Sequence, residues 1–291
     1  MSLIPSPETF SLIPLSQVQS AAVSWLWPGR IPLGKLTVLD GDLGLGKSTL
    51  LLDLAARVST GSAMPDGTPG LRAGVCLLSA EDGTADTIRP RLEAAGADLA
   101  MIHSLAAIQG PGYEAGRPAS IPRDVALIEQ ALGRAQARLL IIDPLMAYLG
   151  RGVDAGKDQD VRRCLHVLAD TAARTGSAVV LLRHLGQRGG KKAVHRGSGT
   201  IGIIGACRSG LLAAQDPDSP GHRVLACTKA NLAALPASLR FTLEPNDRGV
   251  CRVVWCGVSA LQADGLLRRP DEPEERSALE EGCAVLGELL K

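Results

Sequence analysis

Short apolar runs rich in branched aliphatic residues alternate along the chain with segments whose apolar positions recur every three or four residues. The runs lie at 36–39, 75–78, 139–142 and 179–182. The periodic segments lie at 49–58, 87–95, 125–137 and 161–172, and glycines follow several of them. Such runs are typical of buried strands, and such periodicity is typical of helices that pack on one face. The alternation predicts an α/β fold, a mostly parallel twisted sheet flanked by helices.

The pattern changes beyond Leu211. Closely spaced β-rich runs at 223–228, 238–243 and 251–256 are separated by turn residues at 216–218 and 245–247. These runs predict antiparallel strands that extend the same sheet toward the C-terminus. We therefore expect a lead-in segment at 1–30, in which Trp25 and Trp27 anchor packing. One main domain is expected at 31–262, and a charged tail at 263–291 with a short helix at 278–290.

Bulk composition excludes several classes of protein. The net charge is +1, and aromatic residues make up 2% of the chain, so neither charge nor stacking capacity points to nucleic acid globally. No apolar run approaches the length of a membrane span, and the first residues lack the features of a signal peptide. The seven cysteines contain no C-x-x-C pair, which favours small buried thiols in a reducing compartment. We expect a cytoplasmic protein without a membrane partner.

Residues 41–48 form a complete G-x-x-x-x-G-K-S motif between a predicted strand and a predicted helix. Glycines let successive backbone N–H groups turn toward a phosphate at the positive end of the helix. The lysine of such a loop contacts the β- and γ-phosphates, and the serine hydroxyl holds Mg²⁺. The motif therefore predicts binding of ATP with Mg²⁺. The expected phosphate-binding residues are Gly41, Gly44, Gly46, Lys47, Ser48 and Thr49.

Acidic residues and one histidine follow other predicted strands. Asp143 ends the run 139–142, where a carboxylate is expected to bind Mg²⁺. Because Pro144 comes next, the base that activates water must come from another strand end. Glu81 is in a suitable position after the second run, since ligands gather at the carboxyl ends of parallel strands, and Asp82 is the alternative. His184, at the end of the run 179–182, is a candidate γ-phosphate sensor or a structural histidine.

No acidic residue occurs from Thr171 to Gln215, although acids make up about one residue in ten of the chain. Glycines punctuate the stretch 185–200. A basic loop of this kind suits sequence-independent contact with a phosphate backbone, and a merely solvated loop is the alternative. The cations in this window include Arg183, Arg188, Lys191, Lys192, Arg196 and Arg208, of which Arg188, Lys191, Lys192 and Arg196 are the expected nucleic-acid contacts.

Taken together, these motifs resemble those of the RecA-type ATPases, and among them the hexameric plasmid replicative helicases and their phage and bacterial relatives. The resemblance covers about residues 25–243. Its markers, in chain order, are the segments 25–30, 41–48, 79–82, 89–92, 143–145, 183–185, 197–199, 206–208 and 229–231. The resemblance implies a RecA-like core that assembles into a ring, expected to be a hexamer, with ATP between subunits and single-stranded DNA as the partner.

Carried over position by position, the resemblance gives each matching residue a role. Lys47 and Ser48 become the phosphate and Mg²⁺ ligands, and Asp143 becomes the second carboxylate at the metal. Glu81 becomes the base that activates water, and His184 the sensor. Arg208 becomes a finger directed at the γ-phosphate of a neighbouring subunit, with Lys229 as a companion at the nucleotide. The implied activity is a DNA-stimulated ATPase, a helicase in replication.

The chain departs from these relatives at three places, of which one is that it ends soon after Leu290, where some relatives continue into a further C-terminal region. Leu43 occupies a loop position that often carries proline, and Gly186-Gln187 follows His184-Leu185 where relatives often have Asn-Lys, which removes one cation. Other interpretations of the motifs remain open. They are a filament-forming recombination mediator, a nucleotide-gated regulatory ATPase that acts on a protein partner, and a small-molecule P-loop kinase, for which no acceptor pocket is evident.

Overall fold

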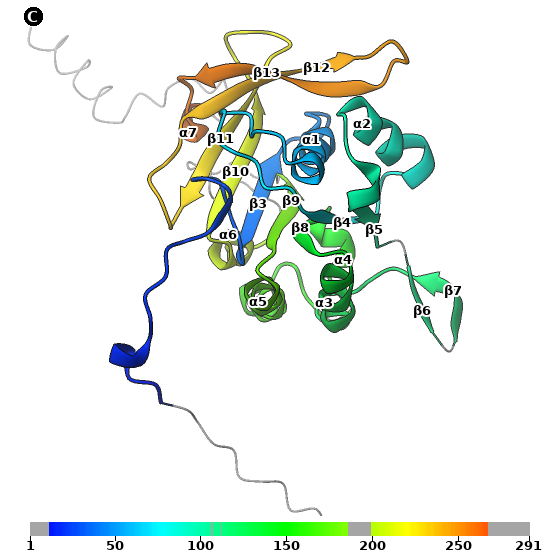
Figure 1. The fold of residues 1–291 in the computed structure, drawn as a ribbon, viewed down its shortest axis with the longest axis vertical. Helices are drawn as coiled ribbons and strands as arrows, with labels where there is room; N and C mark the ends of the chain where they lie inside the picture. The colour runs from blue at the N-terminus through cyan, green and yellow to red at the C-terminus, as the bar shows by residue number, and fades with distance from the viewer. Residues whose placement is uncertain (1–11, 106, 111, 186–198, 267–291) are drawn as a thin grey trace, which may run out of the picture.

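The fold is built on one nine-stranded sheet with the strand order β13-β12-β11-β10-β3-β9-β8-β4-β5 (Figure 1). The structure is a computed structural model that describes residues 12–105, 107–110, 112–185 and 199–266. The strands from β10 to β5 run parallel, and β11, β12 and β13 add on antiparallel. The parallel strands are β3 (Leu36–Gly41), β4 (Gly74–Ser79), β5 (Ile102–Ser104), β8 (Ala137–Asp143), β9 (Ala178–His184) and β10 (Ser209–Gln215). The antiparallel strands are β11 (Arg223–Ala230), β12 (Ser238–Pro245) and β13 (Cys251–Ser259). The predicted fold class is confirmed.

Helices cover both faces of the sheet, which explains why apolar residues occupy most positions of the central strands on both faces. One face carries α1 (Lys47–Thr60) and α2 (Arg89–Ala94), which follows a π-helical turn at Thr84–Ile88. The other carries α3 (Val125–Arg134), α4 (Leu145–Tyr148), α5 (Asp158–Thr175) and α6 (Ile201–Ala206). Along β9, Val180 packs with the first group of helices, whereas Val179 and Leu181 pack with the second. Figure 1 shows α3 and α5 side by side beneath the sheet.

The antiparallel hairpin β12–β13 folds over α1. Trp255 of β13 donates its indole N–H to Asp53 of α1 at 2.9 Å and packs against Phe241 and Trp27. Trp27 is fully buried, as expected of a packing anchor, whereas Trp25 is only half-buried. Both belong to β1 (Trp25–Trp27), which pairs with β2 (Ile31–Pro32) across the expected boundary at residue 30. The aromatic cluster thereby fixes the hairpin beside the helix that follows the phosphate loop.

Several elements differ from the expectations. Strand β10 was not expected, and it lies next to β3 in the parallel part of the sheet. The helix expected at 125–137 ends at Arg134, because Gln136 adopts a positive φ of 45° and β8 begins at Ala137. Short elements add to the plan: β6 (Ile108–Gly110), β7 (Tyr113–Arg117), α7 (Ala263–Leu266) and 3₁₀ turns at Leu15–Gln17 and Leu99–Met101. The helix expected at 278–290 lies outside the described residues.

Two further expectations can be compared with the structure. Cys76, Cys164 and Cys207 are buried free thiols, whereas Cys251 and Cys256 on β13 are free but exposed. Within the described part of the chain, no helix is both long enough and apolar enough to cross a membrane.

Candidate nucleotide site

The phosphate loop connects the end of β3 to the start of α1. Gly44 and Gly46 have φ values of +76° and +77°, a left-handed conformation that favours glycine. Helix α1 begins at Lys47, so the free N–H groups of its first turn face the loop. Lys47 is 4% exposed, and its ammonium donates to the Asp42 carbonyl oxygen at 2.6 Å. Burial lowers the pKa of Lys47, while Asp143 acts in the opposite direction. Gly41 and Thr49 are buried on either side of the loop, and the loop conformation at the start of α1 is compatible with anion binding.

Asp143 ends β8 next to the phosphate loop. Its carboxyl group is 8% exposed, and burial raises the pKa to about 6, whereas the adjacent Ser48 hydroxyl and Lys47 lower it. A buried carboxylate beside a hydroxyl is a donor set of the oxygen type that Mg²⁺ prefers. Ser48 and Asp143 also line one small cavity together with Asp82. The residues present therefore fit a magnesium ion.

Glu81 and His184 face each other on the same rim of the sheet. The sheet register aligns their strands, because Ser79 pairs with Asp143 and Gly41 pairs with His184. The Nε2 atom of His184 lies 4.0 Å from Oε1 of Glu81, whose side chain is 61% exposed. Its neighbour Asp82 is engaged elsewhere, since its carboxylate accepts from Arg91 at 2.8 Å. Of the two candidate bases, Glu81 is the one without a cation bound to it by a short ion pair.

The surroundings of His184 favour its neutral form. Burial lowers the pKa of His184, Lys47 lowers it further, and Glu81 raises it. Its Nδ1 atom is buried and has no hydrogen-bond partner among the described residues. A neutral imidazole beside a lysine can donate one N–H group to a phosphate oxygen without adding a full charge.

Arg208 lies at the opposite edge of the sheet. Its backbone N–H donates to Leu36 at the beginning of β3, whereas the phosphate loop begins where β3 ends at Gly41. The five residue steps of a strand between these points correspond to roughly 16 Å. The Arg208 side chain is exposed, and no hydrogen bond or ion pair of its guanidinium occurs among the described residues. It cannot serve the phosphate loop of its own chain from this position.

Lys229, on β11, is engaged by helix α6. Its ammonium donates to the carbonyl oxygens of Ile204 and Cys207, each at 2.7 Å. These are carbonyl groups at the C-terminal end of α6 that have no partner within the helix. Burial lowers the pKa of Lys229, and Arg208 adds to that effect. The structure thus places Lys229 near Arg208 but gives its charge a local partner.

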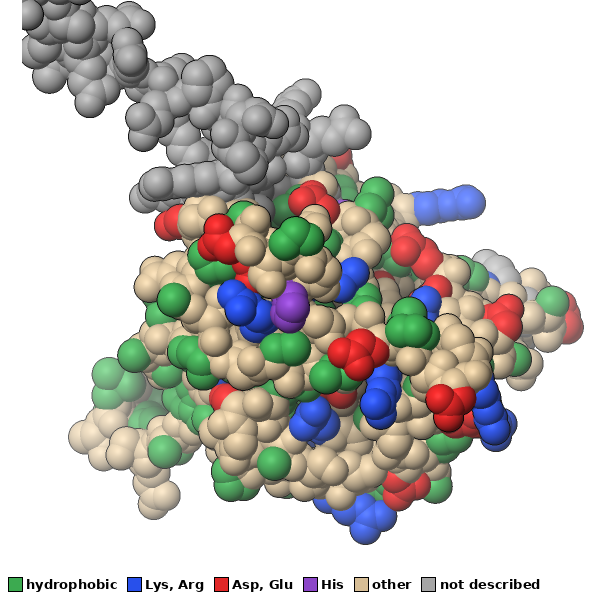
Figure 2. All heavy atoms as spheres, turned by 90° about the horizontal axis from the view of Figure 1, so that it is seen from above, with side chains coloured by type: hydrophobic (Ala, Val, Ile, Leu, Met, Phe, Trp, Pro, Cys, Tyr) green, Lys and Arg blue, Asp and Glu red, His purple; other side chains and the backbone are tan. Residues whose placement is uncertain are grey.

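The six cations named above for the acid-free window fall into three groups. Arg183 is 1% exposed and forms a two-pronged ion pair with Asp40 at 2.7 and 2.8 Å, so it belongs to the core and not to a basic surface. Arg208 is exposed. Arg188, Lys191, Lys192 and Arg196 lie outside the described residues. On the face seen in Figure 2, acidic and basic side chains are interspersed, as the net charge of +1 suggests.

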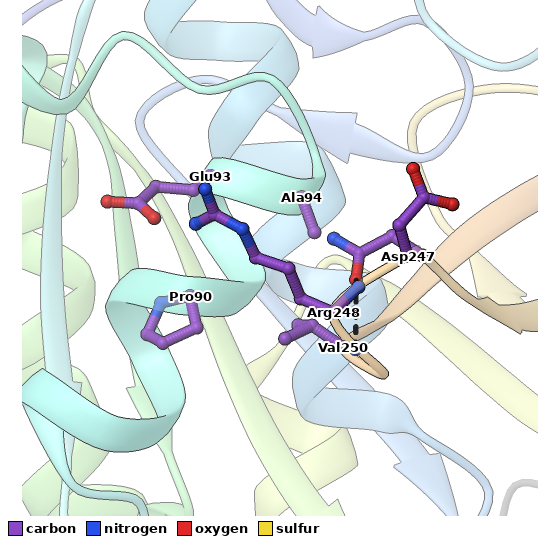
Figure 3. Close-up of a pocket in the computed structure, with 7 residues that line it drawn as sticks. Pro90, Glu93, Ala94, Asp247, Arg248 and Val250 are labelled. Atoms are coloured by element: carbon purple, nitrogen blue, oxygen red, sulfur yellow. Dashed lines mark hydrogen bonds between the residues drawn. The ribbon is translucent and has the colours of Figure 1, made fainter.

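Two features of the hairpin β12–β13 had no signal in the sequence. Leu243 of β12 lies against Gly46, where an added Cβ would meet its side chain. A cavity of about 410 Å³ lies between α2 and the turn that joins β12 to β13 (Figure 3). Glu93 and Arg248 line it from the two sides, and it contains none of the predicted site residues. Both features arise because the hairpin β12–β13 packs against α1 and α2.

Comparison with known proteins gives one positive result. A family model described as an AAA domain matches residues 6–190, which is well over half of the chain. A comparison with curated proteins returned no match. The matched region contains the phosphate loop, Glu81, Asp143 and His184, and the chain belongs to the AAA domain family of P-loop ATPases.

Proposed function

We propose that the protein is a ring-forming motor that hydrolyses ATP between adjacent copies and acts on single-stranded DNA. The observation that carries the proposal is the position of Arg208. This exposed cation lies at the sheet edge opposite its own phosphate loop, so a role at a phosphate requires a second copy. An arginine that enters a neighbouring site stabilises the charge that develops on the transferred phosphoryl group.

Within one copy, the residues on the rim of the sheet divide the chemistry. The phosphate loop and Lys47 bind the phosphates, and Ser48 with Asp143 would hold Mg²⁺, which neutralises charge on the β- and γ-phosphates when bound. Glu81 accepts a proton from the attacking water. His184, which faces Glu81 at 4.0 Å, donates to the terminal phosphate.

The DNA-binding part of the proposal rests on the segment that follows His184. Between Leu185 and Gly199, the sequence contains four lysine or arginine residues and no acidic residue. Both ends of the segment lie beside the nucleotide rim, because His184 ends β9 and Thr200 precedes α6. A basic segment in this position could contact a phosphate backbone and respond to the nucleotide.

The first test measures ATP hydrolysis with and without single-stranded DNA at two salt concentrations, and the assembly state with ATP. We expect a multimer whose hydrolysis is stimulated by DNA, less so at high salt, and absent in Lys47→Ala. Replacing Arg188, Lys191, Lys192 and Arg196 by glutamine should abolish the stimulation. A matched control replaces four exposed arginines elsewhere, Arg123, Arg134, Arg248 and Arg252, and should retain it. A monomer whose hydrolysis ignores DNA would refute the proposal, and Lys47-dependent hydrolysis alone would favour a protein partner.

A further inference from the structure

The proposed function brings together the phosphate loop of one copy and Arg208 of the next. Within a single copy, helix α6 lies between these two features. We propose that the buried pair Asp40–Arg183 and α6 form a link, by which nucleotide in the phosphate loop of one copy sets the position of that copy's Arg208 at the next site. Asp40 and Arg183 are then positioning residues. The inference rests on the proposed action of Arg208 in a neighbouring copy.

The first step of the link is the ion pair itself. Asp40 immediately precedes Gly41, the first residue of the phosphate loop, and Arg183 immediately precedes His184. Their side chains are 2% and 1% exposed, and the guanidinium meets both carboxylate oxygens. The Nη1 atom of Arg183 also lies 3.5 Å from the carbonyl oxygen of Thr200. One guanidinium therefore contacts the strand that carries the phosphate loop and the residue from which α6 begins.

The second step is the packing of α6 as a rigid body. Thr200 caps the helix by accepting from the Gly202 N–H at 3.2 Å, and Ile203 and Ile204 are buried against the sheet. Helix α5 approaches closely because α6 has glycines on that side. An added Cβ at Gly202 would meet the Asp158 carboxylate, and one at Gly205 would meet the Arg162 guanidinium. A helix held this tightly shifts as a unit.

The third step is the far end of α6. Lys229 binds the carbonyl oxygens of Ile204 and Cys207, and Arg208 follows directly. A helix of six residues is only about 9 Å long, so a displacement at Thr200 is passed on to Arg208 with little loss. The contacts form a continuous series from Gly41 to Arg208, and all residues of this series belong to the part of the chain that the structure describes.

The alternative is that the ion pair only stabilises the fold. The double variant Asp40→Leu with Arg183→Met separates the two possibilities, because exchanging both buried charges for apolar groups is often tolerated. Arg183→Lys is the second variant. It retains the charge beside Asp40 but loses the fork that spans Asp40 and Thr200. Thermal unfolding and nucleotide binding establish that each variant is folded and loaded.

The experiment mixes subunits. Wild-type rings are doped with increasing fractions of Lys47→Ala subunits, which lack nucleotide but carry Arg208, and ATP hydrolysis is measured. With the link intact, each empty subunit also weakens its neighbour's site, so activity falls more steeply than the fraction of wild-type subunits. The same doping series is repeated in the Asp40→Leu, Arg183→Met background and in the Arg183→Lys background. There, ATP hydrolysis is expected to fall in proportion to the fraction of subunits that retain Lys47.

Two outcomes overturn the inference, and they are distinguishable. If ATP hydrolysis falls in the same way with the fraction of Lys47→Ala subunits in the wild-type and the variant backgrounds, the link is wrong. Action of Arg208 in a neighbouring copy can still hold in that case. Doping with Arg208→Ala tests that action directly. If the activity does not fall as the fraction of this variant rises, no arginine acts between copies, and both the proposed function and the link fail.

Discussion

The Nε2 atom of His184 lies 4.0 Å from Oε1 of Glu81, although their strands β9 and β4 are separated in the sheet by β8. Asp143, at the end of β8, lies between them in the order of the strands. The three side chains thus meet from three neighbouring strand ends, as ligands do at the carboxyl edge of an open α/β sheet. The predictions for Glu81 and Asp143 follow from this arrangement.

Glu81→Gln should lower kcat by about 10²–10⁴-fold, because the amide cannot accept the proton of the attacking water. ATP binding should be preserved, since Glu81 is exposed and does not belong to the phosphate loop. The measurements are steady-state hydrolysis and equilibrium binding of a fluorescent nucleotide. Asp82→Asn is the matched control. It removes the neighbouring carboxylate, which Arg91 already engages, and it should change kcat much less. The reverse order of effects would make Asp82 the base.

Gly46→Ala should weaken ATP binding by about tenfold or more. Its φ of +77° costs alanine roughly 1–2 kcal/mol, and the added Cβ would also meet Leu243. Gly67→Ala provides the control, because Gly67 has a similar φ of +81° but no atom within 4 Å of an added Cβ. Both variants should lose a similar amount of stability from backbone strain. Only Gly46→Ala should lose nucleotide affinity, and equal affinities would show that Leu243 does not confine the loop.

Asp143 should make the stability of the metal-free protein depend on pH. Burial raises the pKa of this carboxyl group to about 6 from an ordinary 3.8, so the folded protein holds a proton that the unfolded chain releases. Its contribution therefore stabilises the folded state at low pH and is lost as the pH rises from about 4 to about 6. Asp143→Asn should accordingly be more stable than wild type at pH 7, by up to roughly 3 kcal/mol, and not at pH 4.

Urea unfolding in a chelator between pH 4 and pH 7.5 measures this difference. Asp247→Asn, at an exposed carboxylate, should leave the pH dependence of wild type unchanged. A wild-type protein that gains stability relative to Asp143→Asn as the pH rises would contradict the burial argument.

The parallel core and the phosphate loop could be predicted from sequence, because each has a local cause. Strands buried on both faces form nearly continuous apolar runs, and the motif at 41–48 encodes its own backbone conformation. Strand β10 could not be predicted in this way. Its sequence, Ser209–Gln215, contains glycine and alanines and no β-branched residue, and its burial depends on β3 and β11 on either side.

The roles of individual charged residues were harder to predict than the positions of the strands. Arg183 and Arg208 both lie in the acid-free window, yet one is buried against Asp40, which is 143 residues away in sequence, and the other is exposed. No local pattern distinguishes them, because the partner comes from sheet pairing. Lys229 is a similar case. Its partners are the carbonyls at the end of α6, which the pairing of β10 with β11 brings beside it.

Lys229 and Arg208 are neighbouring cations with different surroundings, and their variants should separate stability from activity. Lys229→Met leaves the carbonyl oxygens of Ile204 and Cys207 without their charged donor, so we expect a loss of about 1–2 kcal/mol in unfolding free energy. Arg208→Ala removes an exposed side chain without a described partner, and its unfolding free energy should match that of wild type while hydrolysis falls. Denaturant unfolding and ATP hydrolysis, measured on both variants and on Lys229→Arg as a conservative control, decide the point. If Lys229→Met instead lowered kcat with unchanged stability, the lysine would leave α6 in the assembled ring and act at the neighbouring phosphate.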